Sequence, residues 1–305
     1  MGVVRLPVIC GPTAAGKSGL ALALADRCGM GIISADSRQV YRGFDIGTAK
    51  PTAAERRRVP HEGIDVADPV ERYSAARWAA GVEGWLASLA AQGRAPLVVG
   101  GTGLYLRALA EPLFEEPPLD PEARAALDRE LRLLPLEELR RRCLALDPAR
   151  AHLGRTQLLR AIEVATLTGR PISALHRERA REARYALRYL LVDPGPVLRD
   201  WIAHRVDAML AAGWVEEVER LMASVPAHAP AWNATGYDTI RQVVLGTLPL
   251  ARAREQVVIA TRQYAKRQRT WFRHQVPGAQ VVHVNSADPG ALERAMAWCA
   301  EERLR

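Results

Sequence analysis

Residues 3–18 read VVRLPVIC-GPTAAGKS, and this stretch determines the fold class that we expect of the chain. Its first half is a short apolar run rich in β-branched residues, which predicts a buried strand. Its second half fits the phosphate-binding pattern G-x-x-x-x-G-K-[S/T] (the P-loop), and residues 17–28 continue with helical periodicity. Strand, glycine-rich turn and helix therefore follow in the order that this motif requires.

The backbone N–H groups of such a turn, together with the N-terminus of the next helix, surround an anion. Lys17 is expected to reach the distal phosphates, and the Ser18 hydroxyl is expected to ligate Mg²⁺, the cofactor that we predict. The predicted phosphate-binding residues are Gly11, Pro12, Thr13, Ala14, Ala15, Gly16, Lys17 and Ser18. This motif is usually read as ATP-binding, but it indicates phosphates and magnesium without indicating hydrolysis.

The alternation of strands and helices continues beyond the loop, with a strand at 32–35, a helix at 73–91 and a strand at 96–100. It predicts an α/β fold in which a P-loop-type parallel sheet core is flanked by helices. Ligands of such sheets bind beyond the carboxyl ends of the strands. Gly11, Asp36 and Thr102 each follow a predicted strand, so we expect them to meet in one cleft.

The pattern changes after residue 110, because residues 111–121 are rich in proline and acidic side chains and indicate a boundary loop. Only helices are predicted from 120 to 184, and the helix at 155–168 has Leu158, Ile162 and Ala165 on one face. A strand at 189–192 and long helices at 197–212 and 251–272 follow. We therefore predict a core of residues 1–115 and 187–305, interrupted by an all-helical insertion domain at 116–186.

The net charge of +8 suggests a polyanionic partner, and the distribution of charge is more informative than its sum. Residues 256–287 contain no Asp or Glu, while five cations, Arg262, Lys266, Arg267, Arg269 and Arg273, fall within twelve residues. A solvated helix face would usually mix signs, so this stretch favours contact with a nucleic acid or phosphate. The chain has no apolar run long enough to span a membrane and no signal-peptide pattern, which predicts a cytosolic protein.

A second segment, residues 34–51, reads SADSRQVYRGFDIGTAKP and is long and polar for a connection between elements. Long ordered loops at the mouth of a cleft usually bind a ligand. Asp36 at its start is open to three interpretations: a carboxylate that holds Mg²⁺, a general base, or a helix cap without chemistry.

Six segments carry a more specific signal: the P-loop, residues 36–51, VGGTGLY at 99–105, RAIEV at 160–164, GWVEEV at 213–218 and TRQYAKRQRTWF at 261–272. Together they resemble the bacterial tRNA dimethylallyltransferase family. They occur in order from residue 8 to about residue 273. The P-loop is shared with many families, whereas residues 36–51 and 261–272 are much more selective.

The resemblance implies a P-loop core whose helical insertion grips the anticodon stem-loop. It implies transfer of the five-carbon group of dimethylallyl diphosphate to the exocyclic amine of the adenosine 3′ of the anticodon. That amine is a poor nucleophile, and Asp36 corresponds to the family's proposed general base. Thr102 corresponds to a hydroxyl beside the target adenine, and Arg205 to an arginine near the diphosphate. Lys17, Ser18 and Mg²⁺ would neutralise the departing diphosphate.

A base stacked in RNA cannot enter such a cleft, so the target adenosine is expected to flip out. The tRNA-binding residues are implied by the resemblance and by the helical stretch within 256–287 that has no Asp or Glu (the acid-free helix). They are Asp36, Ser37, Arg38, Gln39, Thr102, Arg124, Gln157, Leu158, Leu159, Arg160, Ala161, Lys266, Arg267 and Arg269. Tyr41 and Trp271 are candidate stacking groups, although core packing is the more common role for either one. A monomer is expected from the family.

The chain departs from the family pattern at two places. His61-Glu62 stands where a His-His pair is common, and residues 152–156 are shorter than usual, with Gln157 where an arginine is usual. Three alternatives remain: a nucleotide kinase or ATPase, an adenylate isopentenyltransferase acting on a free nucleotide, and a non-enzymatic RNA-binding protein. A kinase does not account for the acid-free helix or the Thr102 loop, and RNA binding alone does not require a P-loop.

Overall fold

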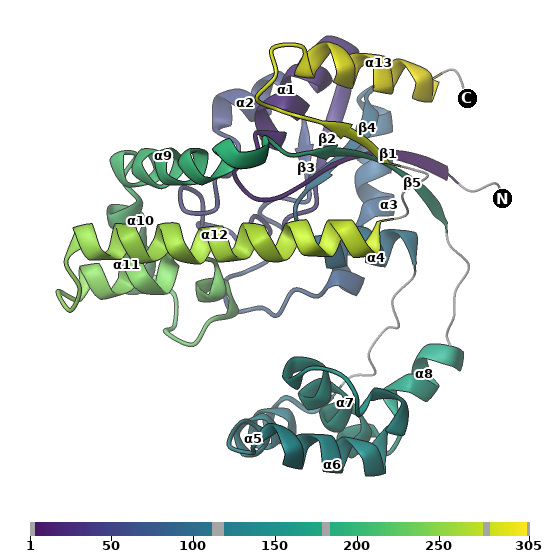
Figure 1. Cartoon of the computed structure of the whole chain (residues 1–305), viewed down its shortest axis with the longest axis vertical. Coiled ribbons are helices and arrows are strands. Elements are labelled where there is room, and N and C mark those ends of the chain that lie inside the picture. Colours follow the sequence, from purple (N-terminus) through teal and green to yellow (C-terminus); the bar gives the residue numbers. More distant parts are fainter. Residues whose placement is uncertain (1–3, 112–118, 179–183, 277–280, 304–305) are drawn as a thin grey trace. The chain divides into compact units, whose positions relative to one another are not determined.

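The computed structural model describes residues 4–111, 119–178, 184–276 and 281–303. The chain divides into two compact units, one made of residues 1–110 and 183–305 and the other of residues 111–182 (Figure 1). The larger unit contains a six-stranded sheet with helices on its faces, and every described element of the smaller unit is a helix.

All five strand pairs of the sheet are parallel, in the order β3-β2-β4-β1-β5-β6. The strands are β1 (Val4–Cys10), β2 (Met30–Ser34), β3 (His61–Glu62), β4 (Ala95–Gly100), β5 (Tyr185–Val192) and β6 (Val281–Val284). The central strand β1 pairs Val8 with Val98 of β4 and with Tyr189 of β5. The fold class predicted from the P-loop and the strand–helix alternation is therefore confirmed.

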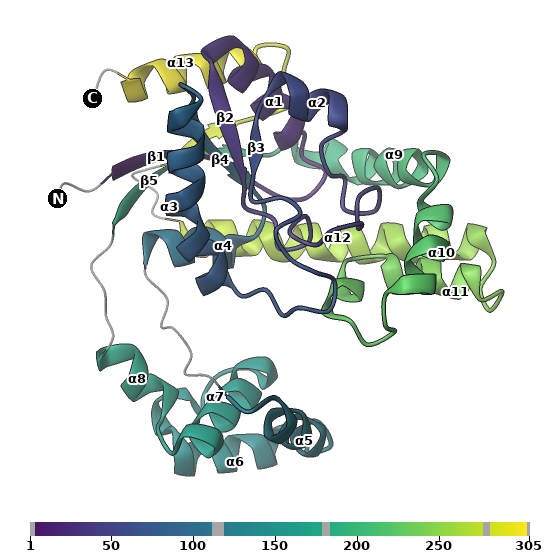
Figure 2. The same ribbon diagram turned by 180° about the vertical axis from the view of Figure 1, so that it is seen from behind.

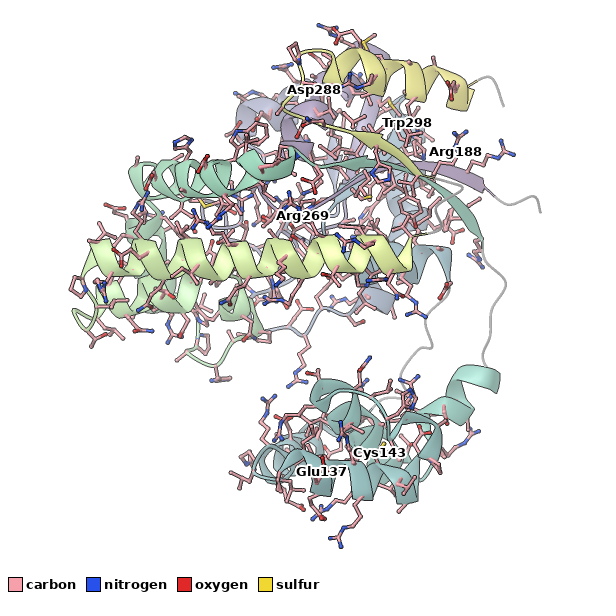
Figure 3. The ribbon with its side chains drawn as sticks, in the orientation of Figure 1. Glu137, Cys143, Arg188, Arg269, Asp288 and Trp298 are labelled. Atoms are coloured by element: carbon pink, nitrogen blue, oxygen red, sulfur yellow. The ribbon has the colours of Figure 1, made fainter. Side chains whose placement is uncertain are left out.

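One face of the sheet is covered by α1 (Lys17–Cys28) and α13 (Ala291–Arg303), the first and last helices of the chain (Figure 2). Ile9, Leu24, Leu190 and Trp298 belong to the hydrophobic cluster that these helices form with the strands. Figure 3 shows Trp298 directed from α13 toward the sheet, and its side chain is only 3% exposed. Burial of apolar side chains on this face fixes the helix that follows the P-loop.

The opposite face carries α3 (Ala75–Ala91) and α4 (Gly103–Ala110). Leu89 of α3 lies so close to β2 that a Cβ atom at Gly31 would stand 2.3 Å from its Cδ2. The indole of Trp78 is fully buried, stacks on Tyr105 at 5.0 Å between ring centroids and donates a hydrogen bond to the Ser34 carbonyl at 2.9 Å. This bond supports the end of β2, immediately before Asp36.

The larger unit contains further helices besides these four. They are α2 (Ala53–Arg58), α9 (Leu198–Ala211), α10 (Trp214–Ser224), α11 (Tyr237–Val244) and α12 (Leu250–Gln275), with the short helices η2 (Gly195–Val197) and η3 (Pro230–Asn233). The long α12 packs along α9 and α11 (Figure 1). No helix of the described ranges is long and apolar enough to cross a membrane.

The smaller unit contains α5 (Pro121–Arg132), α6 (Leu136–Leu146), η1 (Pro148–Arg150), α7 (Arg155–Thr168) and α8 (Ile172–Glu178). Its core gathers Leu131, Leu139, Cys143 and Ile162. This unit spans residues 111–182, whereas the sequence predicted an insertion domain at 116–186. Residues 185 and 186, predicted as insertion, belong instead to β5, because Val4 and Arg5 of β1 pair with them. Because β1 is distant from these residues in the sequence, the local sequence gives no sign that the strand begins there.

Candidate active site

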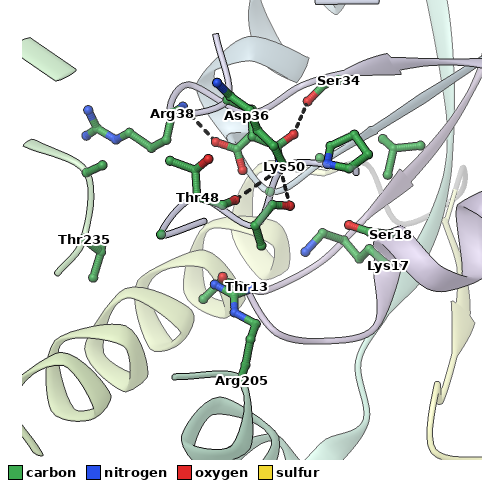
Figure 4. A pocket seen from close by; sticks show the side chains of 18 of the residues that line it. Thr13, Lys17, Ser18, Ser34, Asp36, Arg38, Thr48, Lys50, Arg205 and Thr235 are labelled. Carbon is green, nitrogen blue, oxygen red and sulfur yellow. Dashed lines mark hydrogen bonds between the residues drawn. The ribbon is translucent and has the colours of Figure 1, made fainter. Parts of the chain in front are cut away.

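A cavity of about 260 Å³ lies at the carboxyl ends of β1, β2 and β4 (Figure 4). Its lining includes Lys17 and Ser18 of the P-loop, Asp36 and Arg38 after β2, and Arg205 on α9. Further lining comes from the 47–51 loop, from Trp214 and from one face of α12 that carries Val257, Thr261, Tyr264 and Gln268. A cleft is therefore present at the predicted edge of the sheet, and segments far apart in the sequence form it. Of the three residues predicted to meet there, Asp36 lines it, whereas Gly11 and Thr102 lie outside its lining.

The P-loop has the backbone that an anion-binding turn needs. Gly16 caps α1 at φ 79, and Gly11 has φ 143. A Cβ atom at Gly11 would lie 2.1 Å from the Val192 carbonyl oxygen, so β5 leaves room only for glycine. Gly11 is consequently buried and outside the cavity lining. The Lys17 ammonium donates a hydrogen bond to the Pro12 carbonyl at 2.6 Å, across the loop.

The cations of the site are tuned by burial and by each other. Burial and the nearby Arg205 lower the pKa of Lys17 to about 8, while Asp36 acts in the opposite direction. Burial likewise lowers the pKa of the Arg205 guanidinium, which Asp36 partly offsets. Two cations brought together in a buried place favour a bound anion, because an anion offsets their mutual repulsion and stabilises the protonated form of Lys17.

A second hollow, of about 360 Å³, lies on the outer side of the loop. It is lined by residues 14–19 together with Trp201, His204 and Arg205 of α9. Lys17, Ser18 and Arg205 line both spaces, so an anion held by the loop would be reached from either side. Cys10, just before the loop, is no nucleophile, because burial raises the pKa of its thiol to about 12.

Asp36 does not cap a helix. Its Oδ1 accepts a hydrogen bond from the Arg38 N–H at 2.8 Å and closes a turn, since residues 37–40 are not helical. Its Oδ2 accepts no hydrogen bond from any residue that the structure describes. Of the three interpretations of Asp36, the helix cap is therefore excluded, and a carboxylate oxygen remains for a ligand.

Thr102 is joined to the Asp36 turn although the cavity lining stops at Gly101. Its Oγ1 accepts a hydrogen bond from the Ser37 N–H at 3.0 Å, and its N–H donates to the Ala35 carbonyl at 3.2 Å. Tyr264 of α12 lines the cavity, and burial raises the pKa of its phenol to about 12. Tyr264 belongs to the motif at 261–272, but the sequence predicted no role for it.

Helix α12 is tied to the loops that follow β1, β4 and β5 by two adjacent residues, Gln268 and Arg269. The Gln268 carboxamide bridges Thr13 of the P-loop and Gly101 after β4. Arg269 forms a two-pronged ion pair with Asp193 and donates to the Gly195 carbonyl at 2.8 Å. Arg269 is thus partly buried and paired within the protein, in contrast to the exposed Lys266 and Arg267.

The 36–51 loop is held by buried polar groups for which the sequence predicted no role. Glu217 of α10 is 3% exposed and accepts hydrogen bonds from the N–H groups of Asp45 at 3.0 Å and Ile46 at 2.6 Å, and from the Tyr237 hydroxyl at 2.7 Å. Lys50 is also buried and binds Asp45 and Asp65. These contacts set the position of the cavity wall at residues 47–51.

Gln39, predicted to contact tRNA, is engaged within the same loop. Its Oε1 accepts a hydrogen bond from the Ser34 hydroxyl at 2.9 Å, and its Nε2 donates to the carbonyls of Thr48 at 3.2 Å and Ala49 at 3.0 Å. Tyr41 is 4% exposed, which supports packing over stacking. Trp271 covers Gly103, where a Cβ atom would lie 2.3 Å from its ring.

In the helical unit, Arg124 and Arg160 converge on Glu163, which is 8% exposed. Arg124 binds both oxygens of that carboxylate, at 2.6 and 3.1 Å. Gln157 is exposed and Leu159 partly exposed. The sequence predicted that Leu158 and Ala161 contact tRNA, and the structure corrects this. Both are fully buried in the core of this unit, because they lie on the inward face of α7. Their side chains are not available to RNA.

The comparisons with known proteins place these observations in a family context. A family model described as IPP transferase matches residues 39–275, and one described as isopentenyl transferase matches residues 4–62. A tRNA dimethylallyltransferase of Halorhodospira halophila is 44% identical in an alignment that covers 90% of this chain and 92% of that protein. One of Nitrosococcus oceani is 42% identical, covering 96% of both chains.

Two solved structures are similar over nearly the whole chain. A tRNA isopentenylpyrophosphate transferase of Bacillus halodurans is 31% identical with a TM-score of 0.67, covering 98% of this chain and 96% of that one. A eukaryotic dimethylallyltransferase acting on tRNA is 25% identical with a TM-score of 0.80, covering 98% of this chain and 79% of that one.

Proposed function

Because the chain belongs to the tRNA dimethylallyltransferase family and is a tRNA-prenylating transferase, we propose that its donor is dimethylallyl diphosphate. We propose that its acceptor is the exocyclic N6 amine of the adenosine 3′ of the anticodon. The observation that carries this proposal is one cavity lined at once by Lys17, Ser18 and the Asp36 carboxylate. An anion cradle and a free carboxylate oxygen in one space suit transfer between a diphosphate and an amine.

The P-loop binds the diphosphate and stabilises it as it leaves. Lys17, Arg205 and the N-terminus of α1 surround the loop, and each supplies positive potential to the developing charge. The bond that breaks is the carbon–oxygen bond at the allylic carbon, so no phosphorus–oxygen bond is cleaved. The phosphate-binding motif serves here to hold a leaving group.

The residues at the loop fit a magnesium ion that is shared with the diphosphate. Ser18 faces the cavity at the start of α1, and the described residues contain no cluster of three His, Cys, Asp or Glu side chains that would hold a metal without the substrate. Ser18 would therefore supply one ligand, with diphosphate oxygens and water completing the shell. When bound, Mg²⁺ supplies positive charge to the diphosphate oxygens.

Asp36 acts as the general base. The N6 lone pair forms the new bond to the allylic carbon as the diphosphate departs, and the N6 proton passes to the Asp36 carboxylate. The Arg38 N–H holds Oδ1, which leaves Oδ2 for this proton. Thr102 is tied to the same turn through Ser37 and orients the amine.

The acceptor reaches this carboxylate as a flipped base, since a stacked adenine would not present its N6 edge to a recessed group. The exposed Lys266 and Arg267 lie on α12, the helix whose inner face lines the cavity through Tyr264 and Gln268. These cations contact tRNA phosphates beside the site. Arg124 and Arg160 of the helical unit contact the anticodon stem.

The proposed function is tested by incubating the protein with radiolabelled dimethylallyl diphosphate and either tRNA or AMP. We expect label in tRNA, on the adenosine 3′ of the anticodon, after nuclease digestion. Label in AMP alone would establish an adenylate isopentenyltransferase. Label in neither acceptor, with release of phosphate from ATP, would establish a nucleotide kinase or ATPase and contradict the proposal.

A further inference from the structure

One backbone hydrogen-bond donor of the P-loop is already used within the protein. Pro12 has no N–H, and the Thr13 N–H donates to Gln268 Oε1 at 2.7 Å. Gln268 lines the cavity and is 7% exposed. A side chain from α12 therefore occupies this donor of the loop, in the cavity that Asp36 also lines.

The orientation of this carboxamide is set by its second partner. Gln268 Nε2 donates to the Gly101 carbonyl at 2.8 Å, and a carbonyl accepts hydrogen bonds only. A Cβ atom at Gly101 would stand 2.5 Å from Nε2, so glycine at this position leaves the room that the amide needs. The oxygen of Gln268 is thereby held against the loop, with one lone pair remaining.

Two oxygen acceptors lie beside the loop. Gln268 Oε1 accepts from its Thr13 N–H, and the Asp36 carboxylate is close enough to Lys17 and Arg205 to act on the pKa of both. In phosphoryl-transfer sites, the third phosphate of a nucleotide stands between the loop and the acceptor. In prenyl transfer the group in that position is a hydrocarbon that becomes positively charged as the carbon–oxygen bond breaks. Oxygen lone pairs favour the second group and oppose the first.

We propose that Gln268 makes this P-loop selective for a diphosphate over a triphosphate. Its carboxamide withholds the Thr13 N–H from a third phosphate and presents an oxygen in the space where that phosphate would extend. Lys17, Arg205 and the first turn of α1 remain for two phosphates. The inference deepens the proposed function and rests on it, because it takes the loop as the site of the donor's diphosphate.

The test compares the affinities of the protein for inorganic pyrophosphate and inorganic tripolyphosphate, which differ by the third phosphate. Both are measured by titration calorimetry in one magnesium-containing buffer. The full-length protein is expected to prefer pyrophosphate by at least about tenfold. In Gln268→Ala, the freed Thr13 N–H should raise the affinity for tripolyphosphate relative to pyrophosphate by about tenfold. Gln268→Glu keeps the acceptor and adds charge, so it should not gain tripolyphosphate affinity.

Gln263→Ala is the matched control, because Gln263 is an exposed glutamine of the same helix and its replacement should leave the ratio unchanged. The wild-type ratio needs no variant, so it tests the inference even where a Gln268 variant does not fold. Equal affinity of the wild type for both anions, or the wild-type ratio in a folded Gln268→Ala protein, would overturn the inference. Failure of the proposed function is seen separately, as absence of wild-type prenyl transfer to tRNA.

Discussion

At the scale of single residues, Asp36 has one carboxylate oxygen bound to a backbone N–H and one that meets no described donor. If this oxygen accepts the N6 proton, Asp36→Asn should lower the rate of prenyl transfer by at least about 100-fold. General base catalysis typically accelerates a reaction by a factor of about 10²–10⁴. Binding of tRNA, measured by filter retention, should change little. Asp238→Asn, which removes an exposed carboxylate, is the control. Transfer at the wild-type rate by Asp36→Asn would exclude this role.

The Lys17 ammonium gives the site a pH dependence. Because burial and Arg205 lower its pKa to about 8, Lys17 of the free protein loses its proton as the pH rises through that value. Binding of a diphosphate favours the protonated form, so pyrophosphate affinity should fall above about pH 8. Calorimetry from pH 6.5 to 9.5 measures this fall.

Lys17→Arg separates this effect from the titration of pyrophosphate itself, because arginine stays protonated across the range. The difference between the two profiles should appear only at the alkaline end. Identical profiles for both proteins would show that Lys17 does not titrate there.

At the scale of elements, the loop of residues 36–51 depends on a carboxylate from another helix. Glu217 accepts the N–H groups of Asp45 and Ile46 and the Tyr237 hydroxyl. In Glu217→Gln, an NH₂ group would face these donors and leave one of them unpaired. We expect a loss of about 1–3 kcal/mol in the free energy of unfolding, measured with urea, together with slower transfer. The exposed neighbour Glu216 supplies the control Glu216→Gln, and equal effects of the two changes would refute this account.

The cations of α12 divide by the face on which they lie. Charge reversal of Lys266 and Arg267 should weaken tRNA binding and reduce the slope of its salt dependence by about 0.7–0.9 for each phosphate that the helix no longer neutralises. Arg269→Met should instead lower the melting temperature, because it breaks the pairing with Asp193 and the bond to Gly195. A Lys266→Glu, Arg267→Glu protein with the wild-type salt slope would show that this helix does not bind tRNA phosphates.

At the scale of the whole molecule, the chain keeps its anion cradle in one unit and the Arg124–Glu163–Arg160 cluster in another. Arg124→Ala should therefore lower tRNA affinity about five- to tenfold while pyrophosphate affinity stays unchanged. Arg129→Ala, an exposed change on the same α5, should affect neither. A parallel loss of pyrophosphate binding in Arg124→Ala would contradict this separation of tasks.

Much of this organisation follows from local patterns. The strand, loop and helix of residues 3–28 were predictable because an apolar run, a glycine spacing and a helical period each act within a few residues. The apolar stripe through Leu158 and Ile162 already indicated the inward face of α7, and the structure shows that the burial of Leu158 follows it. Assigning Leu158 and Ala161 to RNA contact overlooked this helical phase.

The order of the residues was enough to predict the fold class, the P-loop and the position of Asp36 after a strand. The folded chain alone shows that Gln268 holds Thr13, that Glu217 holds residues 45 and 46, and that Arg269 pairs with Asp193. Gln268 and Thr13 are 255 residues apart. Such contacts exist only after the strands and α12 have come together, because a hydrogen bond requires its atoms within about 3 Å and leaves no periodic trace in the chain.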